Sequence, residues 1–528
     1  MTSRPNRLFP GSRTRRVLHG SAALISVALL AACTQAPDPG TSVTPTTTPS
    51  GSSSESPSSG GDGLAQFYGQ KIAWKGCGGS FRCADLTVPL DYSQPDGDTL
   101  AIALIKLPAA DEANRIGSLV LNPGGPGSSG VDYARAARAV VDEKVRDVYD
   151  VVGFDPRGVG RSDAVKCLTD AQTDAFMAAD ATPDTPEEVA QLEKDSKKFA
   201  DACAKNSSKL LAHIGTENAA RDIDVLRAAL GDKQLNWLGA SYGTLLGATY
   251  AGLFPDKVGR MVLDGALDPA LSNNELLHGQ AKGFELALQH FVEDCAKQAD
   301  CPLPRDEQAG VDRIKQFLDD LDANPLATGD PKRPLTQALA ANAILGYLYV
   351  PPFDWEQLRF GLQLAFEGDG SVLLSMLDAR VQRTEDGKFA YNPYSSFLSI
   401  SAVDRPDRPT TAESADMAAM WEKESPVFGA YLGWGTLVFG YWPVEATGTP
   451  GEITAPGTGP ILVVGTTYDP ATPYPWAQAL AKQLEGGVLL TRVGDGHTAY
   501  GMGSPCIDEA IDTYLVTGEP PADGTICR

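Results

Sequence analysis

Histidine is scarce in this sequence, and the residue patterns of several protein classes are missing from it. Five histidines occur in 528 residues, with no Cys-x-x-Cys pair and no cysteine–histidine cluster, so the ligand spacing of a zinc site is absent. Acidic residues outnumber basic ones by 67 to 44, giving a formal net charge of −23, which argues against a nucleic-acid partner. No long uncharged apolar run follows residue 33, so we expect no membrane-spanning helix there.

The first 33 residues have the features of an export signal. A basic start is followed by the apolar stretch Ala22–Ala32, which is too short to span a bilayer, and the segment ends in Leu30-Ala31-Ala32-Cys33. That ending resembles a bacterial lipoprotein cleavage box. We predict an exported protein that meets the membrane only through a lipidated Cys33. Ordinary signal cleavage with secretion is the alternative, and Thr14-Arg15-Arg16 is a partial match to a twin-arginine signal.

Composition and hydrophobic pattern divide the remaining chain into a tether, a core and an insertion. Residues 34–63 are rich in Ser, Thr, Pro and Gly and predict a disordered tether. Residues 64–270 and 452–528 alternate short apolar runs with helical patterns, which indicates an α/β fold with a mostly parallel sheet. Residues 271–451 break that alternation. We interpret them as a large, mainly helical cap inserted before the penultimate strand.

The predicted strands are short and end in or near Gly, Asn or Asp. They are Leu86–Leu90, Leu100–Leu107, Ser118–Asn122, Asp150–Phe154, Leu235–Gly239, Arg260–Asp264, Ile461–Gly465 and Val488–Val493. Runs of this kind are typical of buried parallel strands. Ligands of such sheets bind at the carboxyl ends of the strands, and that is where catalytic residues are expected.

With Cys33 set aside, eight cysteines remain, an even number that suggests disulfides in an exported chain. They fall into pairs that are close in sequence. Our hypothesis pairs Cys77 with Cys83, Cys167 with Cys203, Cys295 with Cys301, and Cys506 with Cys527.

The pentapeptide Gly239-Ala240-Ser241-Tyr242-Gly243 lies between a predicted strand and a predicted helix. In that setting a Gly-x-Ser-x-Gly pattern indicates a nucleophilic serine on a tight, strained turn. A second glycine-rich loop, Asn122–Gly127, follows an earlier strand. We expect the backbone amides of Tyr242 and Gly125, with Gly124 as the next choice, to form an oxyanion hole.

His497 is the predicted base, because it follows the last predicted strand; His213, His278 and His290 lie elsewhere. The predicted acid is Asp469, at the end of the strand before it, and Asp264 is the alternative. The chain order Ser, Asp, His is that of α/β-hydrolases. In this mechanism Ser241 attacks a carbonyl and water releases the acyl group, so no metal or cofactor is needed.

At these residues the chain resembles the secreted tripeptidyl-aminopeptidase-like α/β-hydrolases of actinobacteria, relatives of prolyl aminopeptidases. The resemblance runs from about Ala73 to the C-terminus. Its matching stretches are Cys83–Tyr92, Asn122–Gly127, Gly153–Ser162, Gly239–Thr244, Asp469–Pro473, Gly496-His497 and Gly524–Cys527 with Cys506. It implies an exported serine exopeptidase that releases short peptides, tripeptides above all, from substrates with a free N-terminus. It also implies the triad Ser241, Asp469 and His497.

The sequence departs from this family at Ala402 and Phe439, where we expect two cysteines. Their joint absence is consistent with the loss of one disulfide. An aminopeptidase needs an anionic group for the substrate ammonium, and Glu275, Glu285 and Glu293 in the predicted cap are candidates among which the sequence does not choose.

Two other functions fit the same residues. A carboxylesterase or lipase would use the same triad, because ester and peptide hydrolysis share the acyl-enzyme route. A lipoprotein that binds peptides without cleaving them is the other alternative, and the complete Ser, Asp and His set argues against it.

Overall fold

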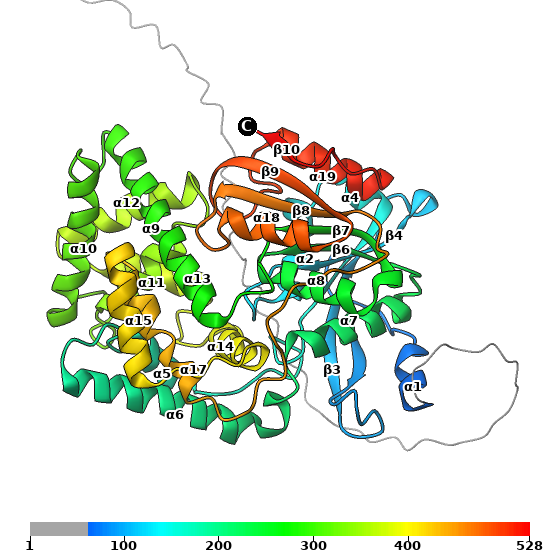
Figure 1. Ribbon diagram of the computed structural model, residues 1–528, viewed down its shortest axis with the longest axis horizontal. Coiled ribbons are helices and arrows are strands. Elements are labelled where there is room, and N and C mark those ends of the chain that lie inside the picture. Colours follow the sequence, from blue (N-terminus) through cyan, green and yellow to red (C-terminus); the bar gives the residue numbers. More distant parts are fainter. Residues whose placement is uncertain (1–61) are drawn as a thin grey trace, which may run out of the picture. The chain divides into compact units, whose positions relative to one another are not determined.

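The structure is a computed structural model that describes residues 62–528 (Figure 1). The predicted signal, Cys33 and nearly all of the predicted tether lie outside these residues. Within residues 62–528 the strands form one ten-stranded sheet in the order β1-β2-β3-β5-β4-β6-β7-β8-β9-β10. The strands are β1 (Lys75–Gly76), β2 (Arg82–Pro89), β3 (Thr99–Leu107), β4 (Gly117–Asn122), β5 (Tyr149–Phe154), β6 (Leu235–Ala240), β7 (Val258–Asp264), β8 (Ile461–Tyr468), β9 (Gly487–Asp495) and β10 (Thr525–Cys527).

The sheet is antiparallel at its N-terminal end and parallel from β5 to β10. All eight predicted strands are present, which confirms a mostly parallel α/β fold. The prediction that the helical insertion precedes the penultimate strand is wrong by one strand. The three-residue β10 pairs with β9, so the insertion precedes the third strand from the end. A run this short has no periodicity that sequence reading could detect.

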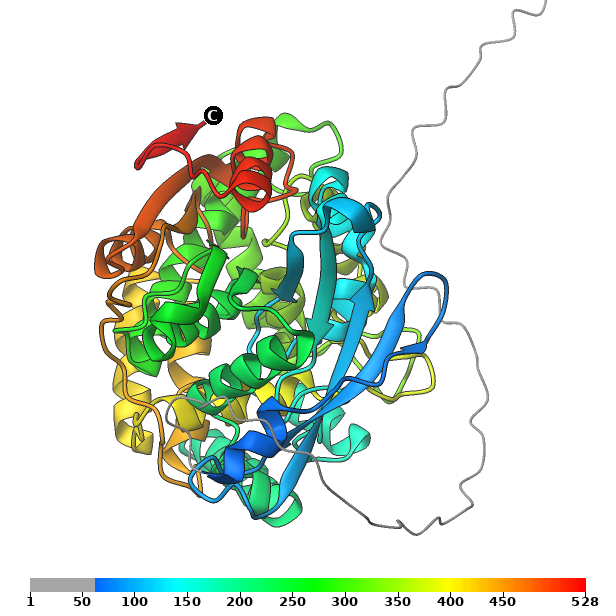
Figure 2. The same cartoon turned by 90° about the vertical axis from the view of Figure 1, so that its right-hand side faces the viewer.

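Helices cover both faces of the sheet, which explains why β4 and β5 are buried at every position. Alternate residues of β4 enter different cores: Leu119 and Leu121 pack on one face with α2 (Gly130–Arg135) and α19 (Pro505–Thr517). Val120 packs on the opposite face with α7 (Thr216–Leu230), α8 (Tyr242–Leu253) and α18 (Tyr474–Gln483). The short helices α3 (Ala137–Val140) and α4 (Glu143–Val148) lead into β5, and α1 (Ala65–Tyr68) lies near the start of the described chain. Figure 2 shows this layered arrangement from the side.

The chain between β7 and β8 is helical. It comprises α9 (Asn273–Lys297), α10 (Glu307–Ala323), α11 (Gln337–Gly346), α12 (Phe353–Phe366), α13 (Ser371–Arg380), α14 (Pro393–Asp404), α15 (Thr411–Glu424), α16 (Gly429–Trp434) and α17 (Leu437–Gly440). Helices α9 to α13 supply most of a second hydrophobic core that is separate from the cores on the sheet.

Two helices that precede β6 pack with these inserted helices, and together they form what we call the helical body (Figure 1). They are α5 (Asp170–Met177) and α6 (Pro186–Leu211). Phe176 of α5 stacks on Phe199 of α6, and both rings contact Tyr394 of α14 edge-on. The helical body therefore contains more of the chain than the insertion alone.

The described residues contain the four predicted disulfides, joining Cys77 to Cys83, Cys167 to Cys203, Cys295 to Cys301, and Cys506 to Cys527. Ala402 and Phe439, where two further cysteines were expected, are both buried in one hydrophobic cluster. None of the helices in residues 62–528 combines the length and the apolar character needed to cross a membrane.

Candidate active site

Ser241 occupies a strained turn between β6 and α8. Its backbone has φ 57° and ψ −126°, a region that residues other than glycine rarely adopt. The flanking glycines permit the turn: a Cβ on Gly239 would lie 2.3 Å from the Gly243 carbonyl oxygen, and one on Gly243 would lie 2.8 Å from that of Asn122. The Ser241 amide donates to the Asp264 carbonyl oxygen at 2.8 Å, which fixes the turn against β7. The Gly-x-Ser-x-Gly pattern thus reflects a real steric requirement.

Asp469 and His497 lie together beyond the ends of β8 and β9. The Nδ1 atom of His497 is 2.9 Å from each carboxylate oxygen of Asp469. The carboxylate is buried and also accepts from the amides of Ala471 and Thr472 at 2.9 and 2.8 Å, and from the Thr472 hydroxyl at 3.0 Å. The His497 amide donates to the Tyr349 carbonyl oxygen at 2.8 Å. An imidazole held in this way has its Nε2 free to accept a proton.

Asp264, the alternative acid, has a different task. Its carboxylate accepts from the amides of Ala499 and Tyr500 at 2.9 to 3.1 Å, and so it braces the loop that carries His497. Burial raises the pKa of Asp264 to about 6. The acid in contact with the imidazole is Asp469, as the sequence analysis predicted.

The other candidate bases are engaged elsewhere. His278 stacks on Trp421 and His290 bonds to Asp495. The His213 carbonyl oxygen accepts from Arg157.

Ser241 and His497 flank Gly265, the residue after β7. A Cβ on Gly265 would lie 3.3 Å from Cε1 of His497, and the preceding residue, Asp264, binds the Ser241 amide. Within residues 62–528 no hydrogen bond joins the Ser241 hydroxyl to His497. Catalytic hydrogen bonds of this kind are often long before substrate binds.

The loop after β4 packs directly on the Ser241 turn. A Cβ on Gly124 would lie 2.5 Å from the Ala240 carbonyl oxygen and 2.8 Å from Cβ of Ser241. The Gly124 amide donates to Oδ1 of Asn122 at 2.9 Å. Over the described part of the chain, the amides of Gly125 and Tyr242 have no hydrogen-bond acceptor. Two free donors beside the serine can stabilise an oxyanion, and Gly125 is preferred to Gly124.

Two hollows that share lining residues lie beside this site. The smaller, about 50 Å³, is lined by Gly125, Tyr242 and side chains from α8, α9 and α14. The larger, about 390 Å³, lies within the helical body and is lined by Tyr349, whose ring contacts His497 edge-on. Both hollows are lined by Leu277, Gln280, Phe397 and Phe439.

Two carboxylates line the larger hollow, Asp180 before α6 and Asp195 on α6. Neither has a lysine or arginine partner among residues 62–528. Sequence reasoning missed both, since they precede the nucleophile strand and lie outside the expected cap. The acids it named are placed elsewhere: Glu275 caps the start of α9, Glu285 accepts from the amides of Val427 and Phe428, and Glu293 is exposed.

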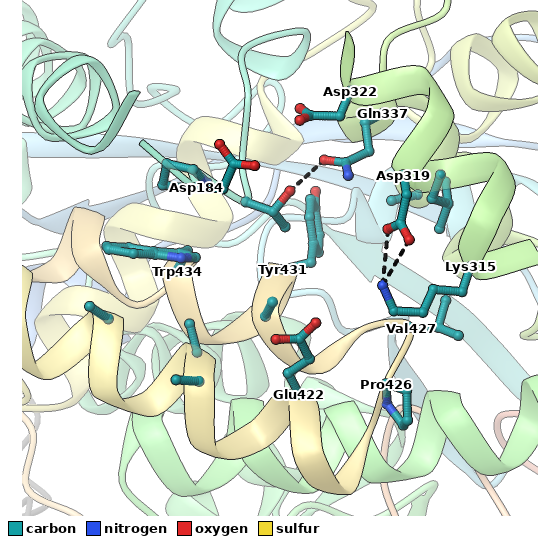
Figure 3. A pocket seen from close by; sticks show the side chains of 18 residues that line it. Asp184, Lys315, Asp319, Asp322, Gln337, Glu422, Pro426, Val427, Tyr431 and Trp434 are labelled. Atoms are coloured by element: carbon teal, nitrogen blue, oxygen red, sulfur yellow. Dashed lines mark hydrogen bonds and ion pairs between the residues drawn. The ribbon is translucent and has the colours of Figure 1, made fainter. Parts of the chain in front are cut away.

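A third hollow, of about 460 Å³, is shown in Figure 3. Tyr431 and Trp434 line both this hollow and the 390 Å³ hollow. The third hollow is acidic. Lys315 pairs with Asp319, while Asp184, Asp322 and Glu422 also line the space. Burial, reinforced by neighbouring carboxylates, raises the pKa of Asp322. The helical body therefore presents negative charge on both sides of these two aromatic side chains.

Comparisons with known proteins agree with this geometry. The family model described as alpha/beta hydrolase fold matches residues 117–500. The chain is 39% identical over 482 residues to serine protease Hip1 of Mycobacterium tuberculosis, covering 87% of this chain and 91% of that protein. It is 37% identical over 453 residues to carboxylesterase B of the same species, covering 84% and 86%. It is 30% identical over 474 residues to the tripeptidyl aminopeptidase of Streptomyces lividans, covering 86% of each.

Solved structures give a weaker likeness. The acetyl esterase MekB is matched with a TM-score of 0.39 and 14% sequence identity, over 83% of this chain and 97% of that one.

Proposed function

Since this chain belongs to the α/β-hydrolase family and is a serine hydrolase, we propose that it removes short peptides, tripeptides above all, from free N-termini. The relatives that support a peptidase include a serine protease and two tripeptidyl aminopeptidases. The observation that carries the proposal is the position of Asp180 and Asp195, which have no basic partner among residues 62–528, in a hollow that shares four lining residues with the one beside Tyr242. Carboxylates placed there can bind the ammonium group of a free N-terminus.

The proposed mechanism proceeds through an acyl-enzyme on Ser241. His497 takes the hydroxyl proton as the serine oxygen attacks the peptide carbonyl, and Asp469 holds the imidazole and stabilises its charge. The amides of Gly125 and Tyr242 bind the negative oxygen of the tetrahedral intermediate. His497 then protonates the leaving amine, and water releases the acyl group.

Asp180 and Asp195 are the proposed anchors for the substrate ammonium. Asp180 accepts from the Thr182 amide at 2.9 Å, and Asp195 from the Gln191 side chain at 2.7 Å, so each keeps acceptor capacity toward the hollow. Burial raises the pKa of Asp180, and a bound ammonium group would favour its charged form.

A second candidate, a carboxylesterase, is favoured by the 37% identity to carboxylesterase B. The triad serves both reactions equally. An esterase needs no carboxylate to bind a substrate ammonium group. Asp180 and Asp195 therefore favour the aminopeptidase over the esterase.

The deciding experiment uses one peptide in free and N-acetylated forms. The chain and its Ser241→Ala variant are incubated with each form, and products are identified by mass spectrometry. Loss of a tripeptide from the free form only, absent with Ser241→Ala, supports the proposal. Asp180→Asn and Asp195→Asn should each raise KM for the free peptide, while Asp184→Asn in the third hollow should leave it unchanged. Hydrolysis of simple esters with neither peptide cut would favour the esterase.

A further inference from the structure

Arg405, the residue after α14, is a buried arginine with unused hydrogen-bond donors. Its side chain lines the 50 Å³ hollow that also contains Gly125 and Tyr242. The residue is only 5% exposed. Its Nε donates to the Leu271 carbonyl oxygen at 2.9 Å. Neither Nη nitrogen has an acceptor within the described chain, and neither is fully enclosed.

Two other buried arginines of the described chain, Arg157 and Arg227, make more hydrogen bonds than Arg405 does. Arg157 is 0% exposed, and its guanidinium binds both carboxylate oxygens of Asp222 at 2.6 and 2.7 Å and three backbone carbonyl oxygens at 2.9 to 3.0 Å. The half-buried Arg408 directs its Nη atoms to four carbonyl oxygens. Arg405 makes a single such bond. Because burying an unpaired charge costs free energy, its free donors indicate a ligand.

No acid of the described chain forms an ion pair with Arg405. None of the carboxylates in residues 62–528 lies within 4.0 Å of its guanidinium nitrogens, by contrast with the Arg157–Asp222 pair. Asp404 accepts from the amide and hydroxyl of Thr216 at 2.7 and 2.5 Å, and Asp407 from the Asn273 amide at 3.1 Å. Burial lowers the pKa of Arg405, and the nearby carboxylates of Asp404 and Asp407 oppose that shift without forming an ion pair with it.

The position of the hollow identifies what enters it. A carbonyl oxygen bound by the amides of Gly125 and Tyr242 belongs to the residue whose peptide bond is cleaved. The Cα atom that carries that residue's side chain is bonded directly to the carbonyl carbon. Most of the hollow's lining is apolar, with Asn273, Gln280, Ser401 and Arg405 as its polar members. Its small volume suits a short side chain that ends in a group able to meet the guanidinium.

We propose that Arg405 selects substrates with aspartate or glutamate immediately before the cleaved bond, by binding the side-chain carboxylate. The inference rests on the proposed function, which supplies the acyl residue. Guanidinium and carboxylate form paired, charge-assisted hydrogen bonds that a neutral amide reproduces poorly. The expected preference for aspartate over asparagine is about 10- to 100-fold in kcat/KM, as for hydrogen bonds to charged groups.

The test uses the full chain and a matched series with Asp, Asn, Glu, Gln or Leu before the cleaved bond. Each acyl sequence is made both as a longer peptide and as an ester. The wild-type chain should prefer Asp to Asn, and Arg405→Met should remove that preference while Arg405→Lys keeps part of it. Labelling by a fluorophosphonate probe checks that each variant retains a reactive serine.

Equal rates for Asp and Asn with the wild-type chain would overturn the inference without reference to any variant. An unchanged ratio in Arg405→Met would overturn it too. The guanidinium would then serve a separate hollow, lined by Thr216, Asp404 and Glu452, whose wall Arg405 also forms. Cleavage of esters but not peptides would refute the peptidase proposal, yet the ester series would still test Arg405, because the acyl group is the same.

Discussion

At the scale of single residues, Gly124 packs closely on the Ser241 turn. Gly124 has φ 93°, and a Cβ there would lie 2.5 Å from the Ala240 carbonyl oxygen. We expect Gly124→Ala to displace the serine turn and to lower kcat at least 100-fold, as misplacement of catalytic groups by about 1 Å does. Gly78→Ala is the matched control, since Gly78 has φ 109° with open space around it. Comparable activity in the two variants would contradict this packing argument.

The two buried acids near His497 should respond differently to the same change. Asp469→Asn leaves an amide facing Nδ1, and we expect kcat to fall by about 10⁴-fold because the imidazole loses its tautomer control. Asp264→Asn keeps one acceptor oxygen for the amides of Ala499 and Tyr500, and a loss of roughly tenfold is expected. Steady-state kinetics on one substrate measures both variants. A greater loss from Asp264→Asn would reverse the assignment.

The proposed triad could be read from the sequence because each of its residues obeys a local rule. Ser241 lies in a motif between strand and helix, and Asp469 and His497 follow consecutive strands. Asp180 and Asp195 obey no such rule. They reach the hollow because α5 and α6 pack against the inserted helices, and contacts between distant segments leave no pattern in a single sequence. Arg405 was missed as well, because a sequence does not show which donors of a buried arginine lack an acceptor.

At the scale of elements, α9 carries a buried acid whose charge opposes folding. Burial raises the pKa of Glu285 from 4.5 to about 7, and within the described chain its Oε1 has no partner. A raised pKa contributes stability that is complete below about pH 4.5 and is lost as the pH rises through 7. We therefore expect Glu285→Gln to increase the free energy of unfolding at pH 8 by roughly 1–3 kcal/mol, which raises the Tm. At pH 4.5 we expect no gain.

Thermal unfolding at the two pH values measures this effect. Glu293→Gln, an exposed change on the same helix, is the control and should show no pH-dependent difference. If Glu285→Gln loses stability equally at pH 4.5 and pH 8, the two hydrogen bonds from Val427 and Phe428 outweigh the buried charge.

At the scale of the whole molecule, the proposed catalytic residues all lie within residues 62–528, and none of the helices described there is suited to crossing a membrane. We propose that the chain is exported and anchored at the cell envelope through lipidated Cys33. Support comes from the apolar stretch that ends in Leu30-Ala31-Ala32-Cys33. A tether behind the anchor would leave the active site free to meet peptides outside the cell.

Replacing this one cysteine should change location and leave catalysis unchanged. We expect the parent chain to sediment with membranes and to incorporate a labelled fatty acid, whereas Cys33→Ser should be released without the label. Their kcat values should agree, because Cys33 lies outside the residues that form the site. A parent protein recovered from the medium, with a mature N-terminus that does not begin at Cys33, would establish ordinary signal cleavage instead. The peptidase proposal would stand in that case, because none of its residues lies in the segment before residue 62.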